Sequence, residues 1–351
     1  MTVDSVGSAG VRGEATPHVS IIVPTHNRPE ALRRLLNSLR NLDYSMGRLE
    51  LIVVGGQRDV GREVVQDFAE SVNFRATYHV VPDEWLTSAS FKRNQGARSA
   101  LGEILAFTDD DCVVQPEWLT EAVSLFRSPG IGAVEGAVHI PKPERPTPTY
   151  RGSLRLSLPG GYQTCNMFYR RTVFDECGGF DLSFPYYMED TDLAYSVMER
   201  GYSIPFSASA VVNHPVPPGR PLKLFTIART VEHMPYLFLK HARSRVRLQA
   251  TTRLLNRSHY LYLTVYGVGL LVALEDPVHG VIVMGLGLCV VLPVHLLHDF
   301  VGLHFTVSEL ALTALSQPAI PLVRLFYWVK GSMKIWLGRK PLTSVLHKGP
   351  M

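Results

Sequence analysis

The sequence predicts an α/β fold in which a mostly parallel sheet is flanked by helices, followed by a helical, membrane-associating C-terminal region. Three observations lead to this prediction. Apolar runs of strand length alternate with segments of helical spacing in the amino-terminal half, which is the pattern of a parallel sheet covered on both faces. One of these runs, which begins at Ile104, ends in three consecutive aspartates. The last third of the chain contains long apolar stretches, which are typical of membrane segments.

The elements of the amino-terminal half follow from apolar spacing and from turn residues. Residues 18–24 form a buried-strand pattern, and Pro29 stands where a helix begins, with apolar residues at helical spacing over 31–39. Further strands are predicted over 49–54, over 76–81 and from 104, and a helix is predicted over 90–101. No GxGxxG motif follows the first strand, which disfavours dinucleotide binding.

The three acids Asp109, Asp110 and Asp111 are the most informative residues of the chain. A strand that buries its body cannot also bury three adjacent unpaired carboxylates, because their desolvation costs too much free energy. We therefore expect them at the exposed carboxyl end of the strand, where open α/β sheets bind ligands. Carboxylate oxygens there suit a hard divalent cation. The alternative is a solvated turn in which an aspartate caps the next helix.

The acids belong to a longer series of motifs in a fixed order. The series consists of Val23–Arg28 (VPTHNR), Arg93–Gly96 (RNQG) with Gly102–Glu103, Thr108–Asp111 (TDDD), Thr164–Arg171 (TCNMFYRR), Gly178–Asp181 (GGFD), Met188–Ala194 (MEDTDLA) and Val211–Pro215 (VVNHP). This series resembles the GT-A fold glycosyltransferases of family 2, over about residues 18–215. The resemblance implies an inverting enzyme that uses a nucleotide-sugar donor together with Mn²⁺ or Mg²⁺.

The resemblance also implies roles for individual residues. The implied nucleotide-sugar-binding residues are Pro24, Thr25, Arg28, Arg93, Asp109 and Asp110. The implied metal ligands are Asp111 and His214, and the implied catalytic residues are Asp190 and Glu189. Two alternatives stay open at this point: Arg93 as a surface helix charge, and His214 as a loop histidine with satisfied hydrogen bonds.

The Glu189–Asp190 pair has both a catalytic and a structural interpretation. Glu189 and Asp192 can favour the start of a helix over 191–200, where carboxylates oppose the positive end of the helix dipole. That role does not explain the aromatic and apolar approach 184–188, which would shield a carboxylate from water and raise its pKa. By the resemblance, Asp190 is the general base that removes a proton from the acceptor hydroxyl.

One position departs from the family pattern. Gly55 and Gly56 stand after the second strand, where family members usually have acids that help to bind the base. The glycines offer no side-chain acceptor, and Asp59 is the nearest substitute. This departure leaves the base and the sugar of the donor undetermined. It also motivates the alternative that the chain is a catalytically silent scaffold.

The C-terminal third predicts membrane association. The apolar stretches 260–274 and 278–297 flank an acidic tip at 275–277, and a third stretch, 310–329, is interrupted by prolines. Basic residues before the hairpin and after the third stretch predict that both flanks face the cytoplasm. The alternative is a helical hairpin buried in a soluble domain.

The prediction thus divides the chain into five parts. These are a disordered N-terminus (1–17), a GT-A catalytic domain (18–215), a loop with basic juxtamembrane helices (216–258), a transmembrane hairpin with an interfacial or re-entrant helix (259–340) and a tail (341–351). A helix over 222–239 is expected to break near Pro235.

Composition excludes some other classes. The net charge is only +4, without a basic stripe interleaved with aromatics, so nucleic acid is not an expected partner. The four cysteines contain no CxxC pair and predict neither a zinc site nor a disulfide framework. We interpret Cys112 and Cys165 as small packing residues.

Together these observations predict an inverting glycosyltransferase at the cytoplasmic face of the cell membrane. It would transfer a sugar to a hydroxyl of a membrane-borne acceptor, either a lipid-linked or a cell-surface glycan precursor. A polyprenyl-phosphate glycosyltransferase is an alternative, although an acceptor phosphate needs no general base. A second alternative is a catalytically silent GT-A membrane scaffold. A processive synthase is disfavoured because no QxxRW motif is present.

Overall fold

The computed structural model describes residues 18–146, 154–184, 187–215, 223–244, 254–300, 303 and 307–338. The chain divides into two compact units. The first comprises Met1–Pro141 and Leu154–Val216, and the second comprises Lys142–Ser153 and Pro217–Met351. The predicted disordered N-terminus, the tail and the stretch 245–253 of the basic run lie outside the described residues.

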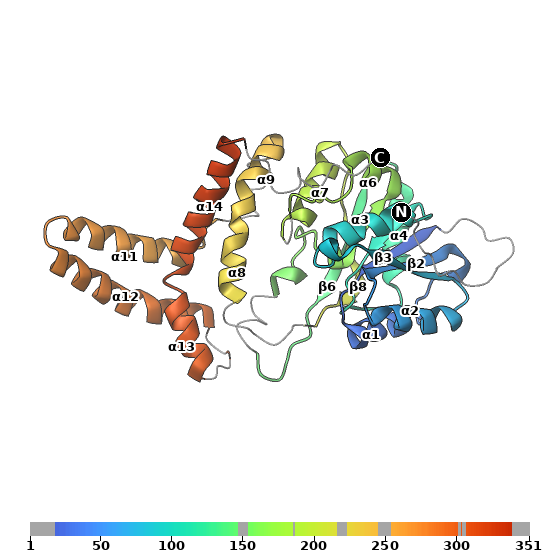
Figure 1. Ribbon diagram of the computed structural model, residues 1–351, viewed down its shortest axis with the longest axis horizontal. Coiled ribbons are helices and arrows are strands. Elements are labelled where there is room, and N and C mark those ends of the chain that lie inside the picture. The colour runs from blue at the N-terminus through green and yellow to red at the C-terminus, as the bar shows by residue number, and fades with distance from the viewer. Residues whose placement is uncertain are drawn as a thin grey trace. The chain divides into compact units, whose positions relative to one another are not determined.

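An eight-stranded sheet forms the centre of the first unit (Figure 1). Its strand order is β3-β2-β1-β4-β7-β6-β8-β5. The strands are β1 (Val19–Pro24), β2 (Leu49–Gly56), β3 (Arg75–Val81), β4 (Ile104–Phe107), β5 (Val113–Val114), β6 (Ala133–His139), β7 (Met167–Arg170) and β8 (Phe206–Asn213). Four strand pairs are parallel, and the antiparallel pairs are β4–β7, β6–β7 and β5–β8. The predicted mostly parallel sheet is confirmed.

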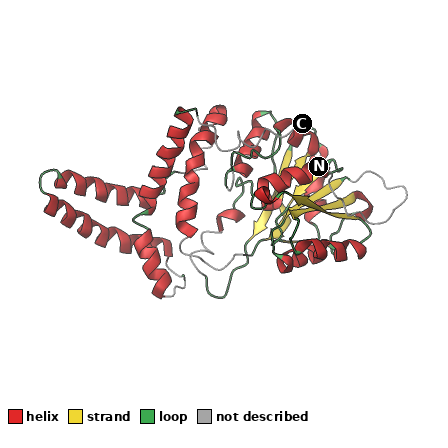
Figure 2. Ribbon diagram, viewed as in Figure 1, coloured by secondary structure: helices red, strands yellow, loops and turns green. Residues whose placement is uncertain are grey.

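Helices cover this sheet on both faces (Figure 2). They are α1 (Pro29–Leu39), α2 (Gly61–Glu70), α3 (Ala89–Ser99), α4 (Trp118–Ser124), α6 (Arg171–Cys177) and α7 (Glu189–Glu199). As predicted, α1 begins at Pro29, and its apolar residues Leu32 and Leu36 are buried on one side. Because parallel crossovers are right-handed, the strand order places α1 and α2 on one face and α3 on the other.

A buried carboxylate fixes the approach of the chain to β4. Glu50, inside β2, is fully buried and accepts hydrogen bonds from Ser20 Oγ (2.6 Å) and from the backbone N–H of Leu101 (2.5 Å). Ser20 Oγ in turn accepts the N–H of Gly102 at 2.8 Å. These bonds hold Leu101 and Gly102, which precede β4, beside β1 and β2. They therefore help to set where β4 lies along the sheet and where the acids that follow it begin.

The second unit is helical. Its helices are α8 (Lys223–Arg229), α9 (Met234–Lys240), α11 (Arg257–Ala273), α12 (Pro277–Phe300), α13 (Val307–Ser316) and α14 (Ile320–Trp336). A 3₁₀ turn over Thr230–His233 separates α8 from α9, so the break predicted near Pro235 is confirmed one turn earlier. The stretch 310–329, predicted to be interrupted by prolines, falls on two helices bent by 49°. Pro318 lies between the two helices and explains the break, since the residue before a proline is disfavoured in the helical conformation.

Helices α11 and α12 form a closely packed hairpin. A side chain at Gly280 would collide with Ala273, and Tyr262 Oη lies 2.9 Å from Nδ1 of His295. In the described part of the chain, one helix is long and apolar enough to cross a membrane, over Pro277–Leu296, with a mean hydropathy of 2.1. The bent pair α13–α14 passes the same criteria only when both helices are taken together.

Candidate active site

The predicted acids lie where the parallel strands end. β4 ends at Phe107, and the N–H of Thr108 still donates to Ile22 O at 3.3 Å, which keeps the chain beside β1. Asp109, Asp110 and Asp111 follow at once. The short strand β5 then pairs antiparallel with β8, and Val113 lies opposite Asn213. This pairing brings His214 next to the acids, although it lies a hundred residues further along the chain.

Three of the predicted residues converge on one point. Asp109, Asp111 and His214 each offer a ligand atom, and these atoms lie within 4.8 Å of one another. We call these three residues the oxygen set, after the carboxylate oxygens of its two aspartates, to which His214 adds a ring nitrogen. Asp111 Oδ1 lies 3.8 Å from His214 Nε2, and it is buried without a hydrogen-bond partner among the described residues. A buried carboxylate oxygen without a partner is costly, and a divalent cation would satisfy it. The residues therefore fit a hard metal ion.

Arg28 and Thr25, which follow β1, contact two of the acids. Arg28 forms ion pairs with Asp110 (2.5 Å) and Asp111 (2.7 Å), and half of its side chain is exposed. Asp110 is fully buried and accepts the hydroxyl of Thr25 at 2.8 Å. Burial raises the pKa of Asp110 to about 6, although Arg28 opposes the shift. Asp110 thus holds Thr25 and Arg28 in place, and its direct contact with a donor stays a prediction.

Arg93 is a buried residue that connects two acidic groups. Its Nη2 donates to Asp109 at 2.7 Å, and its Nη1 lies 3.5 Å from Glu189. The guanidinium also lies 5.7 Å from the ring centroid of Phe180. Only 5% of Arg93 is exposed, so its interpretation as a surface helix charge is wrong. Its charge therefore lies between Asp109 and Glu189.

Glu189 and Asp190 open helix α7. Met188, in the left-handed conformation at φ 78°, turns the chain into the helix without a side-chain cap. Asp190 Oδ1 accepts the N–H of Thr191 at 2.7 Å. Burial, and next the charge of Glu189, raise the pKa of Asp190 to about 7. A carboxyl group with that pKa exchanges its proton near neutral pH, as a general base requires.

The aromatic approach to this pair is only partly described. Phe184 is fully buried and Tyr187 is 39% exposed, while 185 and 186 lie outside the described residues. Burial also raises the pKa of Glu189, although Arg93 opposes that shift. The desolvation inferred from the sequence for this pair is therefore present in the structure.

Sequence reasoning missed Lys92 as a site residue. Lys92 Nζ donates to the backbone oxygen of Thr25 at 2.6 Å, and only 3% of the residue is exposed. Burial lowers its pKa to about 8, although Asp59 and Asp110 oppose the shift. The sequence signal was Gly96, a small residue one turn further along the predicted helix. In the structure Gly96 packs against Ile22 of the sheet, and position 92 lies on the same buried face of the helix.

The space beside Gly55 and Gly56 is occupied by the side chains of Tyr78 and Leu86. A Cβ at Gly55 would overlap the hydroxyl of Tyr78, which donates to Gly56 O at 3.0 Å. Asp59, the expected substitute acid, accepts the N–H groups of Asn27 (2.9 Å) and Gly61 (2.8 Å). It therefore shapes the loop that holds Asn27 at a positive φ of 52°.

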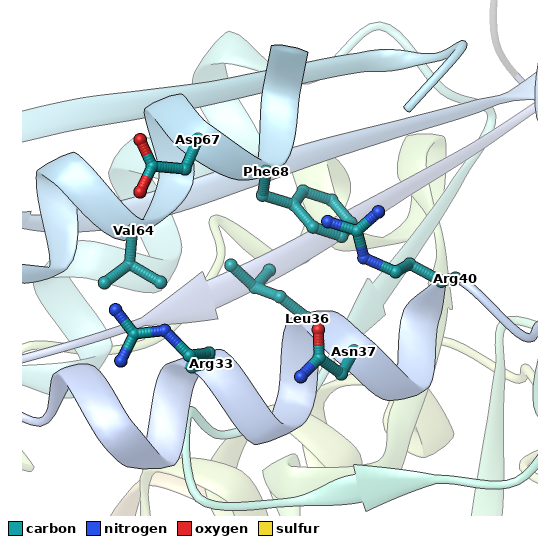
Figure 3. Close-up of a pocket in the computed structure, with 7 residues that line it drawn as sticks. All are labelled: Arg33, Leu36, Asn37, Arg40, Val64, Asp67 and Phe68. Atoms are coloured by element: carbon teal, nitrogen blue, oxygen red, sulfur yellow. The ribbon is translucent and has the colours of Figure 1, made fainter. Parts of the chain in front are cut away.

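A separate hollow of about 220 Å³ lies between α1 and α2 (Figure 3). Its lining is Arg33, Leu36, Asn37, Arg40, Val64, Asp67 and Phe68. None of the predicted site residues lines it. Arg33 pairs with Glu30 at 2.7 Å, and Arg40 lies over the ring of Phe68.

Comparison with known proteins identifies the family. The family model described as glycosyl transferase family 2 matches residues 20–188. Glycosyltransferase AglE of Haloferax volcanii is 26% identical over 214 residues, which cover 58% of this chain and 68% of AglE. Succinoglycan biosynthesis protein ExoM of Rhizobium meliloti is 33% identical over 218 residues, which cover 58% of this chain and 69% of ExoM.

A solved structure shares the fold. Mannosyltransferase PcManGT from Pyrobaculum calidifontis, in complex with GDP-Man and Mn²⁺, matches with a TM-score of 0.53 and 19% identity, covering 99% of this chain and 92% of that one. The fold and the family match define a GT-A glycosyltransferase. The chain belongs to glycosyl transferase family 2.

Proposed function

We propose that this glycosyltransferase is metal-dependent and inverting, and that it transfers a sugar to a hydroxyl of a membrane-borne glycan precursor. The observation that supports the proposal most strongly is the Arg93 bridge. One buried guanidinium contacts both Asp109, of the oxygen set, and Glu189, beside Asp190. This contact supports one site in which the acids after β4 would serve the donor and the acids that open α7 would serve the acceptor hydroxyl.

On the donor side, Asp109, Asp111 and His214 would hold Mn²⁺ or Mg²⁺. The bound ion would act as a Lewis acid toward the diphosphate of the leaving nucleotide. Arg28 is half exposed beside Asp111 and can reach the same phosphates. Thr25 and Pro24, at the end of β1, would line the nucleotide pocket, with Asp110 beneath them.

On the acceptor side, Asp190 would take the proton from the attacking hydroxyl. Its raised pKa, about 7, matches the operating range of a general base. Attack from the face opposite the leaving group inverts the anomeric carbon. Glu189 is ion-paired with Arg93 and would stabilise the site, so Asp190 is the base of the pair.

The acceptor's membrane location is supported by the second unit. Leu274, Val281, Leu286 and Val290 of the α11–α12 hairpin are between 64% and 77% exposed. A contiguous apolar surface of this kind is not stable in water, and a bilayer would cover it. We propose residues 18–215 as the catalytic domain, 216–258 as the juxtamembrane part and 259–340 as the membrane region, at the cytoplasmic face of the cell membrane.

Two alternative functions differ from the proposed one in the chemical groups that they require. A polyprenyl-phosphate glycosyltransferase has an anionic phosphate as its acceptor and does not need a carboxyl with a raised pKa, such as that of Asp190. A catalytically silent scaffold does not need the oxygen set. The similarity to ExoM, a succinoglycan biosynthesis protein, supports a glycan precursor as the acceptor.

A thermal-shift screen of nucleoside diphosphates, with and without Mn²⁺, tests the proposal. A ligand that binds only the folded state raises the melting temperature as its concentration increases. We expect one base to stabilise the protein strongly, and only with Mn²⁺ present. Equal stabilisation by all bases, or no effect of Mn²⁺, would contradict the proposed donor site.

A further inference from the structure

Two buried cysteines meet His214 beside the oxygen set. Cys112 directly follows Asp111, whereas Cys165 belongs to the 3₁₀ turn Thr164–Asn166 that precedes β7. The sulfur atoms of both and a ring nitrogen of His214 lie within 4.8 Å of one another. We call these three residues the thiol set. Cys112 is fully buried and Cys165 is 5% exposed.

The chemistry of these groups is that of a soft-metal site. Thiolates and imidazole are the preferred ligands of Zn²⁺, and three protein ligands with one open position form a common arrangement. His214 Nδ1 lies 3.1 Å from the backbone oxygen of Pro215, so this nitrogen bears the donated hydrogen and Nε2 keeps its lone pair. Metal-binding histidines are oriented by such a bond to a carbonyl.

The position of Cys165 is fixed before any metal binds. The neighbouring Asn166 accepts the indole N–H of Trp118 at 2.7 Å and donates to the backbone oxygens of Ala137 and Ala210, both at 2.8 Å. These bonds connect the 3₁₀ turn to β6 and β8. Because β8 leads directly to His214, the same contacts hold two of the three thiol-set residues in register.

We propose that Cys112, Cys165 and His214 bind a soft divalent cation, with Zn²⁺ as the probe, and that this site shares His214 with the oxygen set. Only one nitrogen of His214 is available, so the histidine serves one cation at a time. Zinc in the thiol set would withdraw His214 from Asp109 and Asp111. No local motif indicates this site, because Cys112 and Cys165 are far apart in the sequence and form no CxxC pair.

Zinc binding is measured first, on the reduced full-length protein, and needs no enzyme activity. We expect one equivalent of Cd²⁺, used as a spectroscopic substitute, to produce a thiolate-to-metal charge-transfer band, and Zn²⁺ to abolish it by competition. Cys165→Ser should remove the band and weaken Zn²⁺ binding by more than the roughly 10–100-fold that loss of an outer-shell partner costs. Cys112→Ala provides a second variant, with folding checked by circular dichroism.

The chain offers matched controls for this experiment. Cys177→Ser and Cys289→Ser remove a half-buried and an exposed cysteine outside the thiol set, and both variants should keep the band. Absence of the band from the unaltered protein would overturn the proposal. Its persistence in both Cys165→Ser and Cys112→Ala would do the same.

The shared histidine is tested separately, and this part rests on the proposed function. We expect added Zn²⁺ to reduce the Mn²⁺-dependent stabilisation by the nucleoside diphosphate, and to reduce it much less in Cys165→Ser. If the charge-transfer band forms but Zn²⁺ leaves the Mn²⁺ response unchanged, His214 is not shared. If the Mn²⁺ response is absent from the start, the proposed donor site fails while the zinc site stands.

Discussion

Arg93 Nη1 lies 3.5 Å from Oε1 of Glu189 and so connects helix α3 with the start of α7. The other end of the same guanidinium donates to Asp109 at 2.7 Å. Because Arg93 is buried, its charge acts on these acids with little screening by solvent. Burial raises the pKa of Asp190, and the positive charge of Arg93 partly opposes this rise.

This relationship predicts a shift in the pH profile of Arg93→Gln. Removing the positive charge should raise the apparent pKa of the rate profile, by about one unit, since a nearby opposite charge lowers a carboxyl pKa by that order. The measurement is the rate of sugar transfer against pH. Arg98→Gln, an exposed position on the same helix, is the control and should leave the profile unchanged. An unshifted profile in Arg93→Gln would mean that Arg93 does not act on the base.

Asp111→Asn should abolish metal-dependent donor binding without unfolding the protein. The amide keeps the shape of the side chain but removes the charge that a hard cation requires. We expect the Mn²⁺-dependent rise in melting temperature with nucleoside diphosphate to disappear. Asp67→Asn, an exposed acid on α2, should retain it. A normal Mn²⁺ response in Asp111→Asn would remove Asp111 from the metal site.

The raised pKa of Asp190 also predicts an effect on stability. In the folded protein its pKa is about 7, against an ordinary value of 3.8, so the folded state binds the proton more tightly. The contribution of this group to stability is therefore greatest at low pH and is lost as the pH rises toward 7. Asp190→Asn should melt at a higher temperature than the unaltered protein at pH 8, and the difference should shrink toward pH 4. A lower melting temperature at pH 8 would show that the carboxylate stabilises the fold.

Asn166→Ala should destabilise the first unit. The substitution leaves the indole N–H of Trp118 and two backbone oxygens without their partners in a buried region. An unsatisfied buried group costs about 1–3 kcal/mol, so we expect a loss of at least about 2 kcal/mol in the free energy of unfolding. Urea denaturation measures it. Asn37→Ala, at a position that lines the α1–α2 hollow, should change stability much less.

Membrane association is tested on the full chain. Sedimentation with membranes, resistance to alkaline extraction and a requirement for detergent are the expected results. Replacing Leu286 and Val290, exposed on α12, by glutamate should release the protein, because charges are costly in the hydrocarbon core. Leu158→Glu, equally exposed in the first unit, is the control. Purification of the unaltered protein from cytosol without detergent would contradict the membrane region.

The strands β1, β2 and β4 were predictable because each consists mainly of consecutive apolar residues. The end of β4 was predictable for the same reason, since three carboxylates cannot continue a buried strand. The contact of His214 with Asp111 was not predictable from spacing, because it depends on the two-residue antiparallel pairing of β5 with β8. The meeting of Cys112 with Cys165 likewise depends on tertiary packing that no local pattern records.

The buried cations were harder to predict than the acids. Lys92 and Arg93 stand in a polar helix, where charged residues normally face solvent. In the structure, Asp109 and Glu189 compensate the charge of Arg93, and Asp59 and Asp110 act on that of Lys92. The burial of the two cations could therefore be inferred only from the tertiary structure. The break between α13 and α14 was visible as prolines, but its 49° bend was not.

The most direct test of the account compares turnover with donor binding in Asp190→Asn. The donor is the nucleotide sugar whose base the thermal-shift screen selects, and the acceptor is a membrane glycolipid extract. We expect donor affinity to stay nearly unchanged while sugar transfer falls by about 10²–10⁴-fold, the usual contribution of a general base. A parallel collapse of donor affinity and turnover, or undiminished transfer, would contradict the assignment of Asp190 as the base.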